Sequence, residues 1–273
     1  MPNPMFNEST MRNASRNWAP PQSGTDYFPP VTDGPVTPWR TGVMTVGGTI
    51  TAAAVLFGLL LVSASVGWIA ATGPTSVEGE KDTFQFPALA MVGLLVGFAC
   101  VIGLYFKPHL AKILGPIYAL AQGFFLGAIS KVYETFYDGI VVQAAGATIA
   151  VFGVMLVLYR TKIIKVTERF RRIVISATIG VMVFYGVCFV IRLFAGSESI
   201  SFLSSPSLLS IAFSLFVAGL AAMNLALDFD FIERGSQQGL SKDFEWYAAF
   251  GLLVTVVWLY LEILRLLSKL RSR

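Results

Sequence analysis

Three carboxylates lie in or beside long apolar stretches of the sequence. Asp228 and Asp230 close one such stretch, and Glu262 lies inside the next. A charged side chain at the centre of a bilayer costs about 2.5–3.5 kcal/mol on insertion scales, so such residues usually face the interior of a helix bundle or water. Two carboxylates in contact there can share one proton, and their oxygens also suit a hard cation such as Ca²⁺. The three acids are therefore candidates for a proton sensor or gate.

Each of these acids also has a simpler interpretation. Glu262 can form a local ion pair with Arg265, which follows three residues later. Asp228 and Asp230 can mark the point at which a helix reaches the lipid headgroups. The two aspartates are about 200° apart on a helix, so at most one of them can point straight into a bundle.

The elements that carry these acids are transmembrane helices. The chain has 273 residues, of which 55% are hydrophobic and 13% charged, against about 25% charged in soluble domains. Continuous apolar runs of about 20 residues match the length of a bilayer-spanning helix, whereas barrel strands alternate apolar and polar residues. We predict an all-α membrane protein with a seven-helix transmembrane domain over 42–273, after a polar, proline-rich tail over 1–41 that is disordered. The predicted spans are 43–71, 86–106, 110–130, 138–159, 173–195, 207–231 and 246–268.

The basic residues predict the orientation of these spans. Thirteen Lys and Arg residues fall on the side of the N-terminus and seven on the other side, which places the N-terminus in the cytoplasm. Seven full spans put the C-terminus outside, but its four basic residues leave that side open. Six basic residues lie within 160–172; they can set the topology or contact anionic lipid. Gly93 with Gly97, and Gly123 with Gly127, have the spacing that lets helices pack closely.

The sequence carries no pattern typical of an enzyme. Its single histidine cannot supply an HExxH zinc site, and no GxSxG, P-loop or GxGD motif occurs. We predict a protein without enzymatic activity, catalytic residues or a cofactor, and the sequence does not define a metal site. The net charge of +4 fits cytoplasmic loops beside a lipid bilayer, and no nucleic-acid partner is expected.

Three segments resemble motifs of the Bax inhibitor-1 family, also called the transmembrane Bax inhibitor motif family. The third predicted span contains PIYALAQGFFLGAIS over 116–130, which is similar to the family's EGLxLG..S motif. The sixth ends in DFDFI over 228–232, similar to YDxxxI, and the seventh contains LYLEI over 259–263, similar to LYLD. The set resembles the bacterial YccA/YetJ-like branch, and NPMF over 3–6 resembles the start of actinobacterial members.

The resemblance implies a bundle in which the seventh span is surrounded by the other six. It also implies a pH-sensitive calcium leak in the plasma membrane of a bacterium, with Ca²⁺ and H⁺ as permeant or gating ions. In the family an acidic pair between spans six and seven acts as the proton sensor. That role falls on Asp228 and Glu262, with Asp230 as the reserve partner.

The chain departs from the family pattern at three points. Glu262 stands where Asp is usual, and Gln122 stands where many members have a Glu, at a position of the pore or of cation access. Asp228 and Glu262 are also 34 residues apart. They reach the same level of a helical hairpin only if its midpoint is near Glu245, and a turn centred at 238–240 offsets them by about 10–15 Å.

The sequence supports a second function. Some relatives are linked to a membrane-bound protease or to stress control, so the chain can instead be a non-conducting membrane regulator. The tail over 1–41 and the basic loop over 160–172 would then be the docking surfaces for a membrane protease.

Overall fold

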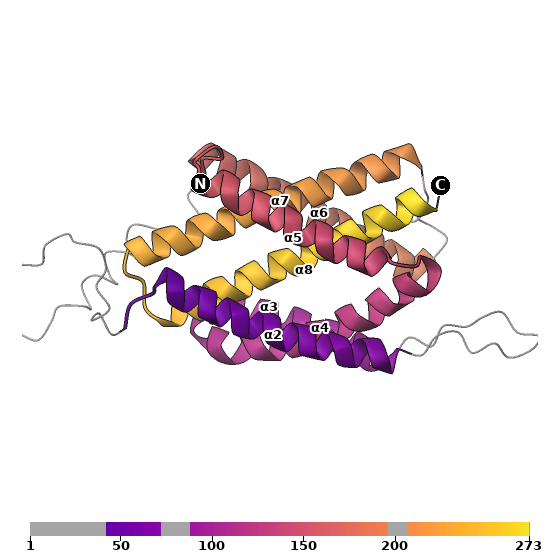
Figure 1. Cartoon of the computed structure of the whole chain (residues 1–273), viewed down its shortest axis with the longest axis horizontal. Helices are drawn as coiled ribbons and strands as arrows, with labels where there is room; N and C mark the ends of the chain where they lie inside the picture. The colour runs from indigo at the N-terminus through magenta and orange to yellow at the C-terminus, as the bar shows by residue number, and fades with distance from the viewer. Residues whose placement is uncertain (1–41, 72–87, 196–206, 273) are drawn as a thin grey trace, which may run out of the picture. The chain divides into compact units, whose positions relative to one another are not determined.

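The described part of the molecule is built from helices. The computed structural model describes residues 42–71, 88–195 and 207–272, and the predicted tail over 1–41 lies outside them. Its elements are α2 (Val46–Ala70), α3 (Ala88–Phe106), the short 3₁₀ helix η2 (Pro108–Leu110), α4 (Ala111–Phe136), α5 (Ile140–Arg160), α6 (Glu168–Ala195), α7 (Leu208–Gln237) and α8 (Asp243–Arg271) (Figure 1). Seven of these described helices are long and apolar enough to cross a membrane. The predicted seven-span, all-helical membrane protein is confirmed.

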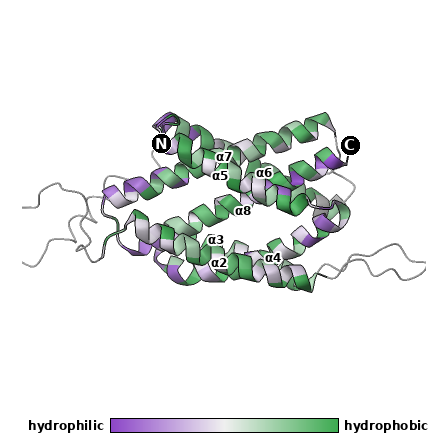
Figure 2. Cartoon of the chain, in the orientation of Figure 1, coloured by the Kyte–Doolittle hydropathy of each residue, from purple (hydrophilic) through white to green (hydrophobic). Residues whose placement is uncertain are grey.

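The distribution of polar residues agrees with a bilayer as the solvent. Figure 2 shows hydrophobic residues along the middles of the helices and hydrophilic residues mostly near their ends. Large apolar side chains such as Ile69, Val142 and Phe194 are exposed on the outside of the bundle. A helix satisfies its own backbone hydrogen bonds, so it can present such a surface directly to lipid.

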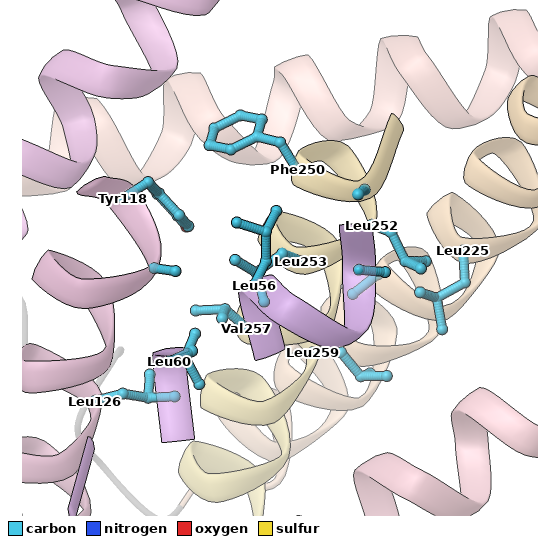
Figure 3. Close-up of a cluster of buried hydrophobic side chains, with 14 of the residues drawn as sticks. Leu56, Leu60, Tyr118, Leu126, Leu225, Phe250, Leu252, Leu253, Val257 and Leu259 are labelled. Carbon is cyan, nitrogen blue, oxygen red and sulfur yellow. The ribbon is translucent and has the colours of Figure 1, made fainter. Parts of the chain in front are cut away.

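The last helix packs against several of the others. α8 lies against α2, α4, α5 and α7, while α3 packs on α4 and α6 packs on α7. The main core contains buried side chains such as Leu56, Tyr118, Leu225 and Leu253, drawn from α2, α4, α7 and α8 (Figure 3). These contacts fix the position of each α8 residue along the bundle axis relative to the neighbouring helices.

Small residues bring α4 close to two neighbouring helices. A Cβ atom at Gly123 or Gly127 would overlap the backbone carbonyl of Leu60 or Ala64 in α2. A Cβ atom at Gly93 of α3 would similarly approach the carbonyl of Ala121. The predicted role of these glycines in close helix packing is confirmed.

A strap at the start of α2 holds the α7–α8 turn. The Met44 amide donates to the Leu240 carbonyl (2.7 Å), and the Lys242 amide donates to the Gly42 carbonyl (3.0 Å). Glu245, which is 5% exposed, accepts from the amide and the hydroxyl of Thr45, both at 2.9 Å. The beginning of α8 is thereby joined to the beginning of α2.

Candidate functional site

Asp228 lies on the buried stripe of α7 and faces α8. Ala221 and Leu225, seven and three residues earlier, are both completely buried, so Asp228 continues the same helix face. A Cβ atom at Gly251 of α8 would lie 3.8 Å from Asp228 Oδ1. The other carboxylate oxygen, Oδ2, is buried and has no hydrogen-bond partner among the described residues. The site is thus a carboxyl group packed at a glycine of the neighbouring helix, and no described cation forms an ion pair with it.

Glu262 has a different environment, in the opposite half of α8. It is 2% exposed and accepts a hydrogen bond from Arg265 Nη1 at 3.1 Å. The Tyr185 hydroxyl of α6 lies 3.4 Å from each carboxylate oxygen. Arg265 also donates to that hydroxyl at 2.7 Å, and its guanidinium lies 5.1 Å from the centre of the tyrosine ring. The local Glu262–Arg265 pair that the sequence allowed is confirmed.

A second cation lies near Glu262. Lys269 is 4% exposed, and its Nζ atom donates to Ser214 Oγ of α7 at 2.7 Å and to the Ser210 carbonyl at 3.4 Å. Glu262, Arg265 and Lys269 follow one another at intervals of three and four residues, so they share a face of α8. The result is a buried polar cluster, the Glu262 cluster, which consists of Glu262, Arg265, Lys269, Tyr185 and Ser214. It joins α8 to α6 and α7.

Asp228 and Glu262, the two acids of the expected sensor, lie at different distances from the α7–α8 turn. α7 ends at Gln237 and α8 begins at Asp243, so the hairpin turn is centred near Leu240. Asp228 precedes this centre by 12 residues and Glu262 follows it by 22, a difference of about 15 Å along a helix. No hydrogen bond joins the two side chains in the described structure. The expected contact is therefore corrected: the turn is centred near Leu240, five residues before the midpoint at Glu245 that would bring the acids level, which is the offset arrangement predicted for a turn at 238–240.

The comparison with known families covers almost the whole chain. The model of the family described as Bax inhibitor 1 like matches residues 3–272. The chain belongs to the Bax inhibitor 1 like family. Among curated proteins, none matches it. The family predicted from the motifs of the third, sixth and seventh spans is confirmed.

The remaining predicted residues of this Bax inhibitor 1 like protein, Asp230 and Gln122, have neighbours of their own. Asp230 pairs with Arg234 at 2.9 Å, and Arg234 also donates to the Val166 carbonyl before α6 (3.1 Å). Gln122 of α4 is 8% exposed and packs at Gly97 of α3, where a Cβ atom would lie 2.5 Å from Gln122 Oε1. Neither residue shares a hydrogen bond with Asp228 or Glu262 in the described structure.

Among its described residues, this family member has a partly buried carboxyl group at Asp228 and no preformed metal site. Within the described residues, no three His, Cys, Asp or Glu side chains are grouped closely enough to hold a metal ion. Beside Asp228 lie the Thr255 hydroxyl and the Gly251 position of α8. Such a sparse set of oxygen ligands favours transient contact over tight binding.

Sequence reasoning missed several members of the Glu262 cluster. Lys269 could have been found, because it follows Glu262 by seven residues on the same helix face. Tyr185 and Ser214 come from other helices, and no local spacing connects them with Glu262. Glu245 was also missed as a buried acid; its place in the first turn of α8 gives no indication that Thr45 binds it.

Proposed function

We propose that this family member is a proton-sensitive cation leak, with calcium as the expected permeant ion. The observation that carries the proposal is the buried, unpartnered oxygen of Asp228 at the contact between α7 and α8. An unpaired charge is expensive to bury, whereas a protonated carboxyl group is neutral. The charge state of Asp228 therefore changes the free energy of bringing α7 and α8 together.

Asp228 and Glu262 have separate roles in this proposal. Asp228 is the proton-responsive group, because the described structure provides no cation to compensate its charge. Glu262 is held by Arg265 and Tyr185, so it acts as a fixed anchor between α8 and α6. Asp230 contributes less, since Arg234 already balances it at the edge of the bundle.

The membrane and its orientation form part of the same proposal. We place the protein in the plasma membrane of a bacterium, as the resemblance implies. Its N-terminus is placed in the cytoplasm because basic residues are concentrated on that side. Membership of the YccA/YetJ-like branch and an actinobacterial origin follow only from the resemblance of the motifs.

Calcium flux into liposomes tests the leak directly. Purified full-length protein is reconstituted, and uptake is followed with an enclosed calcium dye between pH 6 and pH 8. We expect uptake that changes with pH in the wild type and a flat profile in Asp228→Asn. Asp230→Asn is the matched control and should keep the pH dependence. Equal profiles for the wild type and Asp228→Asn would contradict the assignment, and absence of uptake from folded protein at every pH would contradict the leak.

A non-conducting regulator is the second candidate function, and the strap favours it. Residues 42–45 follow the tail directly and are hydrogen-bonded to the α7–α8 turn and to Glu245. A partner such as a membrane-bound protease that held the tail would therefore pull on both helices that carry the acids. Deletion of 1–41 should abolish capture of such a partner while calcium uptake stays unchanged; unchanged capture would contradict this alternative.

A further inference from the structure

A groove opens in the side of the bundle between α2 and α5. Its volume is about 780 Å³, within the usual range of small-ligand sites. α2 and α5 form its walls, and residues of α7 and α8, including Phe229, Leu252 and Val256, form its floor. The lining is almost entirely apolar over most of its length, and it belongs to segments that cross the membrane. In a membrane, this groove would therefore face the acyl chains of the lipids.

The length of the groove along the helices matches the thickness of one membrane leaflet. Along α5 it runs from Thr148 to Arg160, twelve residues or about 18 Å of helix. Along α2 it runs from Val46 to Phe57, or about 16 Å. Half of the hydrocarbon core measures about 15 Å, so an acyl chain from one leaflet matches the length of the groove.

The end of the groove near the membrane surface is polar and carries a cation, Arg160, that has no partner among the described residues. Arg160 is exposed there, and its side chain has no hydrogen bond or ion pair with another described residue. The nearby Glu233 is already engaged, because it accepts hydrogen bonds from the Tyr159 hydroxyl and from Gln237 Nε2. Arg160 also begins the segment 160–172, which carries six basic residues and one acid. The positive charge at this end is complementary to phosphate.

We propose that this groove binds an anionic glycerophospholipid from the leaflet on the N-terminal side. One acyl chain lies between α2 and α5, and the phosphate is bound by Arg160. A guanidinium forms strong, charge-assisted hydrogen bonds to phosphate oxygens, and a negative headgroup also gains about 1 kcal/mol for each nearby basic residue. Lipid binding at this site does not require ion conduction. The experiment below therefore tests it independently of the proposed leak.

Native mass spectrometry of the full-length protein tests the site. The delipidated protein in detergent is titrated with phosphatidylglycerol or with phosphatidylcholine of the same chain length. We expect the first phosphatidylglycerol to bind about tenfold more tightly, as one charge-assisted contact predicts. Arg160→Gln should remove this preference. Lys107→Gln removes a charge from the same end of the bundle but outside the groove, and it should retain the preference.

A second pair of variants tests whether the groove itself holds the acyl chain. Ala54 is exposed in the wall of the groove, so Ala54→Trp should fill the space and abolish the first binding step for both lipids. Leu61→Trp adds a tryptophan to an exposed position of α2 outside the groove and should bind like the wild type. Both positions face lipid, and circular dichroism checks that the variants fold. Equal affinity for the two lipids, or unchanged binding in Ala54→Trp, would overturn the proposal.

Discussion

Asp228, which is partly buried, and Glu262, which is buried, are acids on neighbouring helices with opposite surroundings. Glu262 has a guanidinium at 3.1 Å, a tyrosine hydroxyl and a buried lysine nearby. Asp228 has a glycine and a threonine opposite and one oxygen without a hydrogen bond in the described structure. Under the proposed function, burial alone does not make a carboxyl group a proton sensor. A compensated acid stabilises the bundle, whereas an uncompensated acid makes its packing sensitive to charge.

The largest expected effect on stability comes from Glu262→Gln. The change leaves Arg265 and Lys269 without their carboxylate. Loss of one partner of a fully buried pair costs about 3–5 kcal/mol, and we expect about 2–3 kcal/mol here because Arg265 reaches water; its side chain is 37% exposed. Unfolding by SDS titration in mixed micelles measures the loss. Stability equal to that of the wild type would show that the Glu262 cluster is not an anchor.

Lys269→Met tests the second cation of the same cluster and should have a smaller effect. Methionine keeps the apolar stem but removes the donor to Ser214, while Glu262 keeps Arg265. We expect a loss of about 1–2 kcal/mol from the missing charged hydrogen bond. The same SDS titration measures it, with exposed Lys165→Met as the matched control. A loss as large as that of Glu262→Gln would mean that Lys269, rather than Arg265, is the main partner of the acid.

Asp228→Asn should have the smallest effect on stability and the largest on pH dependence. No ion pair is lost, so we expect a change in unfolding free energy of less than about 1 kcal/mol. Calcium uptake should nevertheless lose its dependence on pH, because asparagine does not titrate. A stability loss matching that of Glu262→Gln would show that Asp228 has a compensating partner, and the contrast between the two acids would disappear.

The sequence predicted the helices well, because each apolar run of about 20 residues has only one stable form in a bilayer. It predicted the family from three short motifs. It misplaced the end of α7, since Glu233, Ser236 and Gln237 are polar and resemble a loop, although they form the last helical turns. That error does not decide whether the acids meet, because the predicted and the observed turns are both centred well before Glu245. Whether two residues of a helical hairpin lie side by side depends on the position of its turn, which hydropathy does not specify.

The composition of the two acidic sites was predicted only in part. The Glu262–Arg265 pair followed from a spacing of three residues on a helix. Tyr185 approaches Glu262 from α6, 77 residues away in sequence, so no local pattern could reveal it. The lack of a partner for Asp228 Oδ2 among the described residues was also hidden, because it depends on which residues of α8 lie opposite.

A double-mutant cycle between Asp228 and Glu262 tests most directly whether the acids form separate sites. The unfolding free energies of the wild type, Asp228→Asn, Glu262→Gln and the double variant are measured by SDS titration. Residues more than 7–10 Å apart without shared partners usually contribute additively to within about 0.5 kcal/mol. We predict additivity within that limit. A coupling energy above about 1 kcal/mol would mean that the two carboxylates act as one pair and would contradict their assignment to separate sites.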